Sequence, residues 1–329
     1  KQQEGIKIAI DMPSGLFSTD NQQNESFPAV FEAHETLSFM SPKMPFFYPA
    51  YVGFVGNFRI LNIDLHPNFS AEPIGEFVLK EDISIVPRTK FSHKGTHGAL
   101  TVIGGLDGMC GAVLIASRAA AKSGCGYVFC ASESPTDTAI FNNTPEVIFE
   151  DIAHLTFDNK TTAIAIGPGL GVSEKALKQV RKAFHSELPL VVDADALNIL
   201  SENQELLDIL PKNAILTPHL GELRRLVGGH KTDEEMLAAQ IEFSKKHQVY
   251  IIQKGPYSKL STPEGKIYIN STGNPGMATA GMGDALTGII GSFLAQGYQP
   301  RDAAIIGMFL HGYAADTYAR NNGQIGMLA

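Results

Sequence analysis

The segment NPGMATAGMGDALTGIIG, residues 274–291, joins a glycine-rich loop to an apolar helix and holds a single acid, Asp284. Gly281 and Gly283 allow backbone N–H groups to point at one spot, and a helix that begins near Asp284 adds the positive end of its dipole. The segment therefore predicts an anion hole that suits a phosphoryl group or an oxyanion. A carboxylate beside such a hole is explained if it acts as a general base on a hydroxyl. The alternative, in which Asp284 only caps the helix, is equally open at this point.

The overall composition is that of an ordinary globular protein. The chain has 329 residues, of which 44% are hydrophobic and 18% charged, and this length predicts two domains or one large domain with an appendage. A formal net charge of -8 and the lack of a long basic run argue against nucleic acids and anionic membranes as partners.

The cysteines and the start of the chain bear on its location and extent. Cys110, Cys125 and Cys130 show no zinc-ligand spacing and are expected to be reduced thiols, which favours a cytoplasmic protein. The sequence has no apolar run of about 18 residues, so we expect no transmembrane helix, and its start lacks the features of a signal peptide. The opening residues KQQEGIKIAID are typical of the middle of a domain, and we expect the sequence to be part of a longer chain.

Two patterns of secondary structure follow each other along the chain. The first part predicts short strands at 6–11, a buried strand that ends on Asp11, and at 35–39 and 58–63, before an irregular, proline-containing boundary at 66–88. Beyond it, strands alternate with helices, which predicts a mostly parallel sheet that helices cover on both faces. Strands are expected at 127–132, 189–197 and 266–270, and strands that run into a turn or glycines at 99–105, 163–171 and 249–258. A strand, turn and helix are expected at 214–226, and helices at 110–124, 174–186, 232–248, 284–297 and 302–319.

Glycines, acids and histidines gather directly after the predicted strands. They form five segments: Gly104–Gly105, Gly167–Gly171, Asp193–Asp195, Thr217–Glu222 and Lys254–Ser258. Because the carboxyl ends of parallel strands share one edge, we expect these segments to line one crevice. Lys254 suits a nucleotide phosphate or ribose, and His219 an anionic or amide group, although each also fits an ordinary turn. Asp193 and Asp195 are expected to point the same way from a strand, and could bind magnesium through water or cap the next helix.

The glycine-rich turn at 104–111 precedes an alanine-rich helix and permits a ligand to approach near Gly111 and Ala112. The acid that a dinucleotide fingerprint requires at the end of the following strand is missing, and the sequence has no GxxxxGK[ST] P-loop.

Six ordered segments resemble a known enzyme family. HKGTHGALTVIGG (93–105), IAIGPGLG, VVDADALN, LTPHLGEL, QKGPYS and NPGMATAGMGDALTGIIG are similar to segments of the ADP/ATP-dependent NAD(P)H-hydrate dehydratases, over residues 89–329. The resemblance implies a ribokinase-like α/β fold. It also implies the nucleotide-dependent dehydration of (6S)-NADHX and (6S)-NADPHX, which carry a hydroxyl at C6 of the reduced nicotinamide ring, back to NADH and NADPH.

The resemblance further implies roles for individual residues. Asp284 would be the catalytic base, with ADP or ATP and Mg²⁺ as cofactors. The hydrate would contact Gly111, Ala112, Gly169, His219 and Asp284. The nucleotide would contact Lys254, Gly255, Pro256, Tyr257, Ser258, Gly281 and Gly283. Ser258 stands where the family more often has Thr, and it keeps the hydroxyl.

The first part of the chain resembles a different domain. IAIDMPSG, AHETLSFMSPK and GNFRILNIDL are similar to the C-terminal part of the NAD(P)H-hydrate epimerase domain, a partial Rossmann-like α/β segment. The implied organisation is an epimerase-like part at 1–75, a linker at 76–88 and a dehydratase domain at 89–329. Asp11 would be a substrate residue and Ser14 a K⁺ ligand, but that family's Asn/Gly/Asp-rich substrate motif is absent. Epimerase activity is therefore expected only in a longer chain.

Two other functions remain as alternatives. A ribokinase-like small-molecule kinase that acts on an alcohol would share the anion hole and the base, although TPHLGEL and KGPYS match dehydratases better. A non-catalytic nucleotide sensor is disfavoured because a carboxylate beside the phosphates would weaken binding. The family resemblance also implies a homo-oligomer.

Overall fold

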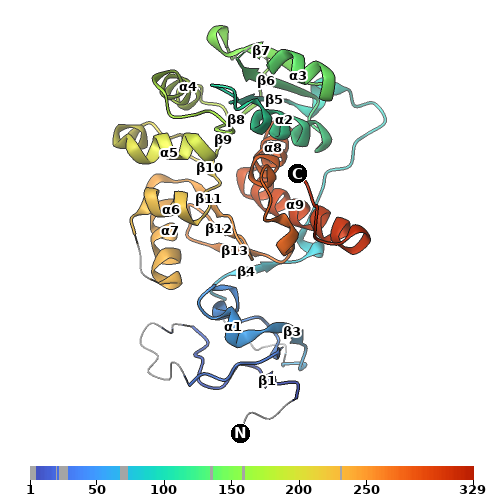
Figure 1. Cartoon of the computed structure of the whole chain (residues 1–329), viewed down its shortest axis with the longest axis vertical. Helices are drawn as coiled ribbons and strands as arrows, with labels where there is room; N and C mark the ends of the chain where they lie inside the picture. The colour runs from blue at the N-terminus through green and yellow to red at the C-terminus, as the bar shows by residue number, and fades with distance from the viewer. Residues whose placement is uncertain are drawn as a thin grey trace. The chain divides into compact units, whose positions relative to one another are not determined.

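The computed structural model of the chain describes residues 5–19, 21, 29–66, 73–133, 136–157, 160–229 and 232–329 (Figure 1). These residues form two compact units. The first comprises residues 1–77 and 229–239, and the second comprises residues 78–228 and 240–329. Among the described residues, no helix combines the length and the apolar character that crossing a membrane requires.

The first unit contains a three-stranded parallel sheet in the order β1-β2-β3. Its strands are β1 (Ile8–Ile10), β2 (Glu35–Phe39) and β3 (Asn57–Leu61), and short helices lie at η1 (Met44–Phe47) and α1 (Val52–Val55). The prediction that the first strand is buried was wrong, since Ile8 and Ile10 are 48% and 61% exposed. The reason is that β1 lies at the edge of the sheet and only Ala9, on its opposite face, is buried.

The second unit is built on a ten-stranded sheet in the order β4-β13-β12-β11-β10-β9-β8-β5-β6-β7. Neighbouring strands pair in parallel along the series β7-β6-β5-β8-β9-β10-β11. Strand β12 pairs antiparallel with both β11 and β13. The strands are β4 (Glu76–Val78), β5 (Ala99–Ile103), β6 (Tyr127–Ser132), β7 (Ile148–Asp151), β8 (Ala163–Ile166), β9 (Leu190–Val192), β10 (Ile215–Leu216), β11 (Tyr250–Gln253), β12 (Lys259–Ser261) and β13 (Ile267–Asn270).

The order of the parallel strands reverses beside β5. From β5 the chain continues to β6 and β7 on one side, and then returns to β8 on the other side of β5. Ligands of open α/β sheets bind outside the carboxyl ends of the strands at such a reversal. The loops that follow β5 and β8 are therefore expected to contact a ligand.

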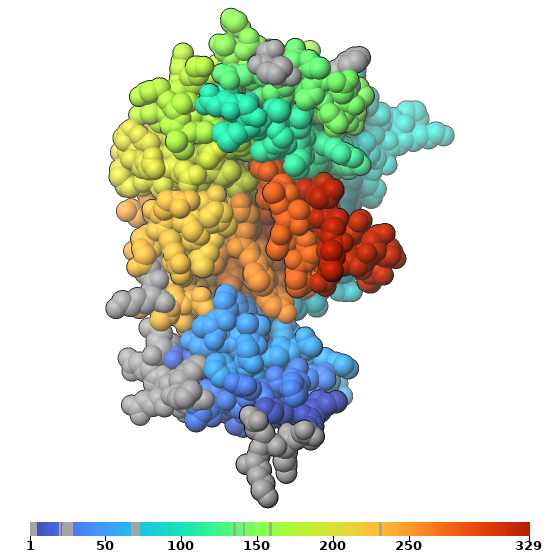
Figure 2. Space-filling view, in the orientation of Figure 1, coloured from blue at the N-terminus to red at the C-terminus, as the bar shows by residue number. Residues whose placement is uncertain are grey.

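Helices cover both faces of this sheet (Figure 1). On one face lie α2, α8 and α9, and on the other lie α4, α5 and α6. The helices are α2 (Cys110–Lys122), α3 (Thr136–Asn143), α4 (Glu174–Phe184), α5 (Ala194–Glu202), α6 (Leu220–Val227), α7 (Asp233–His247), α8 (Met282–Ala295) and α9 (Pro300–Asn322). In the space-filling view, the red C-terminal segment lies at the surface beside the orange segment that precedes it (Figure 2).

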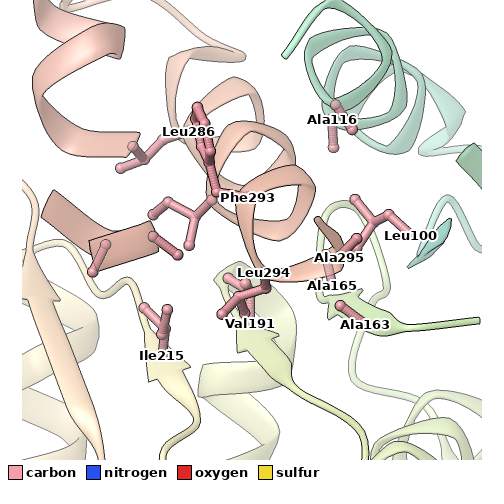
Figure 3. Close-up of a cluster of buried hydrophobic side chains, with 14 of the residues drawn as sticks. Leu100, Ala116, Ala163, Ala165, Val191, Ile215, Leu286, Phe293, Leu294 and Ala295 are labelled. Atoms are coloured by element: carbon pink, nitrogen blue, oxygen red, sulfur yellow. The ribbon is translucent and has the colours of Figure 1, made fainter. Parts of the chain in front are cut away.

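Helix α8 lies at the centre of the core, and glycines bring it close to its neighbours. Figure 3 shows its side chains in one buried cluster with residues of the strands and of α2. A Cβ on Gly288 would lie 2.0 Å from the carbonyl oxygen of Ala116 in α2, and a Cβ on Gly291 would lie 3.0 Å from Leu100 in β5. The two glycines therefore fix the position of α8 against α2 and the sheet.

Several predicted elements differ from the structure. The strand expected at 189–197 was wrong: β9 ends at Val192 and α5 begins at Ala194, since the ADALNILSE sequence buries one helical face. Helix α8 begins at Met282, two residues before Asp284, as expected. Elements α3, β7 and β12 were not predicted, and β4 and the 3-10 helix η2 (Lys80–Asp82) lie within the stretch expected to be a linker.

The contact at Gly288 gives a test of the helix packing. We expect Gly288→Ala to destabilise the protein by roughly 1–3 kcal/mol, because the added methyl group meets backbone of α2 that cannot rotate away. Thermal unfolding followed by circular dichroism should show a melting temperature lower by several degrees. Gly229→Ala is the control, since a Cβ there meets nothing within 4 Å. Equal melting temperatures for the two variants would contradict the close packing.

Candidate active site

The N-terminus of α8 presents free backbone donors. Its N-cap, Gly281, has a left-handed backbone with φ 92°. The next residues are Met282, Gly283 and Asp284, and the N–H groups of Gly283 and Asp284 have no hydrogen-bond partner within the part of the chain that the structure describes. Such N–H groups, together with the helix dipole, are able to bind an anion.

Asp284 does not cap α8, so the alternative role as a helix cap is excluded. The N-cap is Gly281, and no side chain caps the helix. Burial raises the pKa of Asp284 to about 6, and repulsion by the Asp193 carboxylate adds to the effect, whereas Lys254 opposes it. A carboxyl group that titrates near neutral pH is well suited to accept a proton from a substrate.

An ion pair lies beside Asp284. The Nζ atom of Lys254, just after β11, is 2.7 Å from Oδ1 of Asp193, which follows β9. The other oxygen of Asp193 accepts a hydrogen bond of 2.7 Å from the hydroxyl of Thr287, one turn after Asp284 in α8. Asp193 is 1% exposed. The pair therefore connects two strand ends and α8 in a buried environment.

Glu222 of α6 extends this cluster. Its Oε2 atom is 3.8 Å from Nζ of Lys254. Burial raises the pKa of Glu222 above its ordinary value, and the Lys254 charge only partly offsets the effect. For Lys254, burial lowers the pKa, but the carboxylates of Asp193 and Glu222 outweigh burial and raise it. We refer to Asp193, Glu222, Lys254, Asp284 and Thr287 as the acid–lysine cluster.

His219 caps α6. Its Nδ1 atom accepts hydrogen bonds from the N–H groups of Gly221 and Glu222, at 2.9 and 3.2 Å. In return, Oε2 of Glu222 accepts a bond of 2.7 Å from the His219 N–H, which completes a capping box. The imidazole is 55% exposed. With Nδ1 acting as acceptor, the neutral ring carries its hydrogen on Nε2 and can donate it to a ligand.

Three of the residues expected at the hydrate lie together at the reversal of strand order. The loop after β8 rests on the start of α2, because a Cβ on Gly169 would lie 3.3 Å from that of Ala112. The loops after β5 and β8 are joined by the bond from the Leu106 N–H to the Gly169 carbonyl, at 2.9 Å. Gly111 is exposed beside Ala112 in the first turn of α2.

The residues expected at the nucleotide lie at the same edge of the sheet. Residues 254–258 form the turn between β11 and β12, and Ser258 donates its hydroxyl to the Gly255 carbonyl at 3.1 Å. Gly255 and Pro256 are exposed, and Tyr257 has a positive φ of 53°. This turn adjoins the start of α8, because a Cβ on Gly283 would lie 3.3 Å from Nζ of Lys254.

The expected arrangement of Asp193 and Asp195 was wrong. The two acids do not extend from one strand, since Asp193 follows β9 and Asp195 belongs to α5. Asp193 occupies the N-cap position of α5, but its side chain makes no capping hydrogen bond. Asp195 accepts a bond of 2.8 Å from the Gly171 N–H. Among the described residues, no three His, Cys, Asp or Glu side chains are grouped to hold a metal ion.

In the first unit, Asp11 lies just after β1 and its carboxylate accepts hydrogen bonds from Lys43 Nζ and from the Phe39 N–H, the latter at 2.9 Å. Burial alone would raise the pKa of Asp11, but these hydrogen bonds and the Lys43 charge hold it below its ordinary value. Ser14 is exposed in the turn that follows.

Thr287 is the member of the acid–lysine cluster that sequence reasoning missed. A signal was present, because residues three apart on a helix lie on the same face, and Thr287 is three residues after Asp284. Its partner, Asp193, lies 94 residues away, and only the fold brings them together.

The cluster gives a test of its electrostatics. We expect Asp193→Asn to lower the pKa of Asp284 below about 6, because the change removes a repelling charge and leaves the Lys254 charge free to stabilise the carboxylate. Carboxyl ¹³C NMR over a pH titration measures this value. Asp302→Asn, which removes an exposed acid paired with Arg301, is the control and should leave it unchanged. An unchanged or higher pKa of Asp284 in Asp193→Asn would contradict the arrangement.

Comparison with known proteins identifies the family. The family model described as NAD(P)H-hydrate dehydratase matches residues 100–329. The bifunctional NAD(P)H-hydrate repair enzyme Nnr of Moorella thermoacetica is 33% identical over 98% of this chain, and the match covers 64% of that protein. The ADP-dependent (S)-NAD(P)H-hydrate dehydratase of Neisseria meningitidis serogroup B is 39% identical over 74% of this chain and 84% of that protein. The chain thus spans about two thirds of the length of the bifunctional relative.

Solved structures agree with the sequence relatives. The ADP/ATP-dependent NAD(P)H-hydrate dehydratase of Bacillus subtilis, co-crystallized with ATP/Mg²⁺, has a TM-score of 0.71 and 29% identity, over 78% of this chain and 94% of that one. A ribokinase-like superfamily protein of Enterococcus faecalis has a TM-score of 0.70 and 26% identity, over 78% and 92% of the two chains. The predicted ribokinase-like fold is therefore confirmed, and the chain belongs to the NAD(P)H-hydrate dehydratase family.

Proposed function

We propose that this chain catalyses the nucleotide-dependent dehydration of (6S)-NADHX and (6S)-NADPHX to NADH and NADPH. The observation that carries the proposal is the position of Asp284. Its carboxyl group does not cap the helix and has a pKa of about 6. It lies beside the free N–H groups of α8 and the Lys254 ammonium. A base next to an anion-binding helix end is the arrangement that phosphoryl transfer to a hydroxyl requires.

In the proposed reaction, Asp284 removes the proton of the C6 hydroxyl, and the hydroxyl oxygen attacks the terminal phosphoryl group of ADP or ATP. The new oxygen–phosphorus bond forms as the bond to the leaving nucleotide breaks, which releases AMP or ADP. The ring nitrogen lone pair then expels phosphate from C6, and loss of a proton from C5 restores the dihydropyridine. The N–H groups of Gly283 and Asp284 hold the negative charge of the phosphoryl group, and Lys254 lies close enough to assist.

The ligands divide between the two sides of Asp284. We propose that Gly111, Ala112, Gly169 and His219 contact the hydrate, on the side of α2 and the β8 loop. The nucleotide would contact Gly281, Gly283 and the turn of residues 254–258: Lys254, Gly255, Pro256, Tyr257 and Ser258. The exposure of this turn and its closeness to the start of α8 support the second assignment.

Magnesium fits this site as an ion held by the nucleotide. The Asp193 oxygens bind Lys254 and Thr287, and Oε2 of Glu222 binds the His219 N–H, so these carboxylates are engaged within the protein. Mg²⁺ usually keeps several waters and binds substrate phosphates. When bound, it would neutralise the charge of the phosphates.

We also propose that residues 1–75 correspond to the C-terminal part of an epimerase domain, followed by a linker at 76–88 and the dehydratase domain at 89–329. The bifunctional relative supports this proposal because it aligns over 98% of the chain. Epimerase activity, with Asp11 at the substrate and K⁺ at Ser14, would also require that family's Asn/Gly/Asp-rich substrate motif. A cytoplasmic location is consistent with the free thiols of Cys110, Cys125 and Cys130. The exposed apolar side chains of Val86 and Phe91, at 70% and 93%, are consistent with a homo-oligomer.

The role of Asp284 can be tested directly. We expect Asp284→Asn to bind ADP or ATP as the unchanged protein does, but to lower the turnover of NADHX by at least ~100-fold, because the general base is lost. Formation of NADH, followed at about 340 nm with each nucleotide, measures the rate. Asp302→Asn is the control and should keep full activity.

The same assay decides between the dehydratase and a small-molecule kinase. The family relationship does not favour the kinase. Release of NADH with stoichiometric phosphate supports the dehydratase. Accumulation of a stable phosphorylated product without NADH, or near-normal turnover by Asp284→Asn, would contradict the proposed mechanism.

A further inference from the structure

The glycine-rich loop that leads to α8 is held at its start by an acid of α9. The carboxylate of Asp316 accepts hydrogen bonds from the Gly273 N–H and from Nδ2 of Asn274, both at 2.9 Å. Each oxygen of the carboxylate binds one of the two donors. Asp316 is not among the residues predicted to contact the hydrate or the nucleotide, and it lies outside the acid–lysine cluster.

A second contact joins the same helix to the same point of the loop. A Cβ on Gly312 would lie 2.4 Å from the hydroxyl oxygen of Thr272 and 2.8 Å from the Gly273 nitrogen. The Thr272 hydroxyl donates to the carbonyl of Phe309 at 2.9 Å. Phe309, Gly312 and Asp316 are spaced by three and four residues, so they lie on one face of α9. This face therefore fixes residues 272–274 through contacts on successive turns of the helix.

Hydrogen bonds continue from this anchor to the anion-binding helix end. Oδ1 of Asn274 accepts a bond of 3.0 Å from the Gly276 N–H, and the Thr279 hydroxyl donates to the Gly276 carbonyl at 3.2 Å. The Met282 N–H donates to the Thr279 carbonyl at 3.4 Å. The chain of contacts thus runs from Asp316 to the first residue of α8, where the donors of the anion hole begin.

We propose that Asp316 is a positioning residue for the terminal phosphoryl group of the nucleotide. It acts by holding Gly273 and Asn274 so that the loop and its N-cap Gly281 present the N–H groups of Gly283 and Asp284 in the geometry that binds the anion. The inference rests on the proposed function for the identity of the anion. A carboxylate is required because both of its oxygens accept a hydrogen bond, whereas an asparagine offers a single acceptor oxygen.

The experiment compares Asp316→Asn with the unchanged protein. We expect the dissociation constant for ADP with Mg²⁺, measured by calorimetry without hydrate, and the KM for ADP to rise about tenfold. The KM for NADHX should change less than twofold, because the hydrate is assigned to the α2 side of the site. Asp302→Asn, in the first turn of the same helix, is the matched control and should leave all three values unchanged.

A purely structural role for Asp316 would lower the melting temperature without this separation of the two KM values, and that result would overturn the proposal. If Asp316→Asn does not fold, Asn274→Ala removes the next contact in the chain and is expected to give the same tenfold loss of ADP affinity. Unchanged ADP affinity in the folded variant would also overturn the proposal. If the unchanged protein releases no NADH, the proposed function fails, while the ADP titrations still decide the role of Asp316.

Discussion

The ion pair between Lys254 and Asp193 is the constraint on which the rest of the site depends. It joins the ends of β9 and β11, and the Thr287 hydroxyl extends it to α8. A buried carboxylate without a partner is strongly destabilising, so each of these elements has to bring its group to the same place for the fold to form. The same pair sets the electrostatics around Asp284. The negative charge of Asp193 raises the pKa of that acid, and the positive charge of Lys254 keeps the increase moderate.

Backbone packing places the other half of the site. The N-terminus of α8, with its free N–H groups, is positioned by contacts deeper in the molecule, where Gly288 and Gly291 let the helix approach α2 and the sheet closely. At the opposite side, the loops after β5 and β8 meet at the reversal of strand order and rest on α2. The helix α2 therefore serves as a common support, with α8 packed along it and the β8 loop packed on its start.

Local sequence patterns predicted those features that depend on neighbouring residues. Strands at Glu35–Phe39 and Tyr127–Ser132 agree with the structure, because their patterns fill an entire strand. The boundary between β9 and α5 was wrong because DADAL was assigned to the strand, although Asp193 is of a residue type favoured at the N-cap of a helix. The burial of β1 was wrong because an edge position is a property of the sheet. The contacts of Thr287 and Asp316 join residues far apart in the sequence, and no local pattern contains them.

The close packing of α8 also determines where the molecule can adapt. A helix in backbone contact with α2 and the core cannot shift without disturbing both, so its N-terminus is a fixed reference point for the group that reacts. ADP and ATP differ in length by one phosphate. If the last phosphate occupies the same place in both, the difference in length has to be absorbed at the other end of the nucleotide. Gly255 and Pro256 are exposed at the tip of a hairpin, where the backbone can move without cost to the core. We therefore expect tolerance between nucleotides to reside in that hairpin.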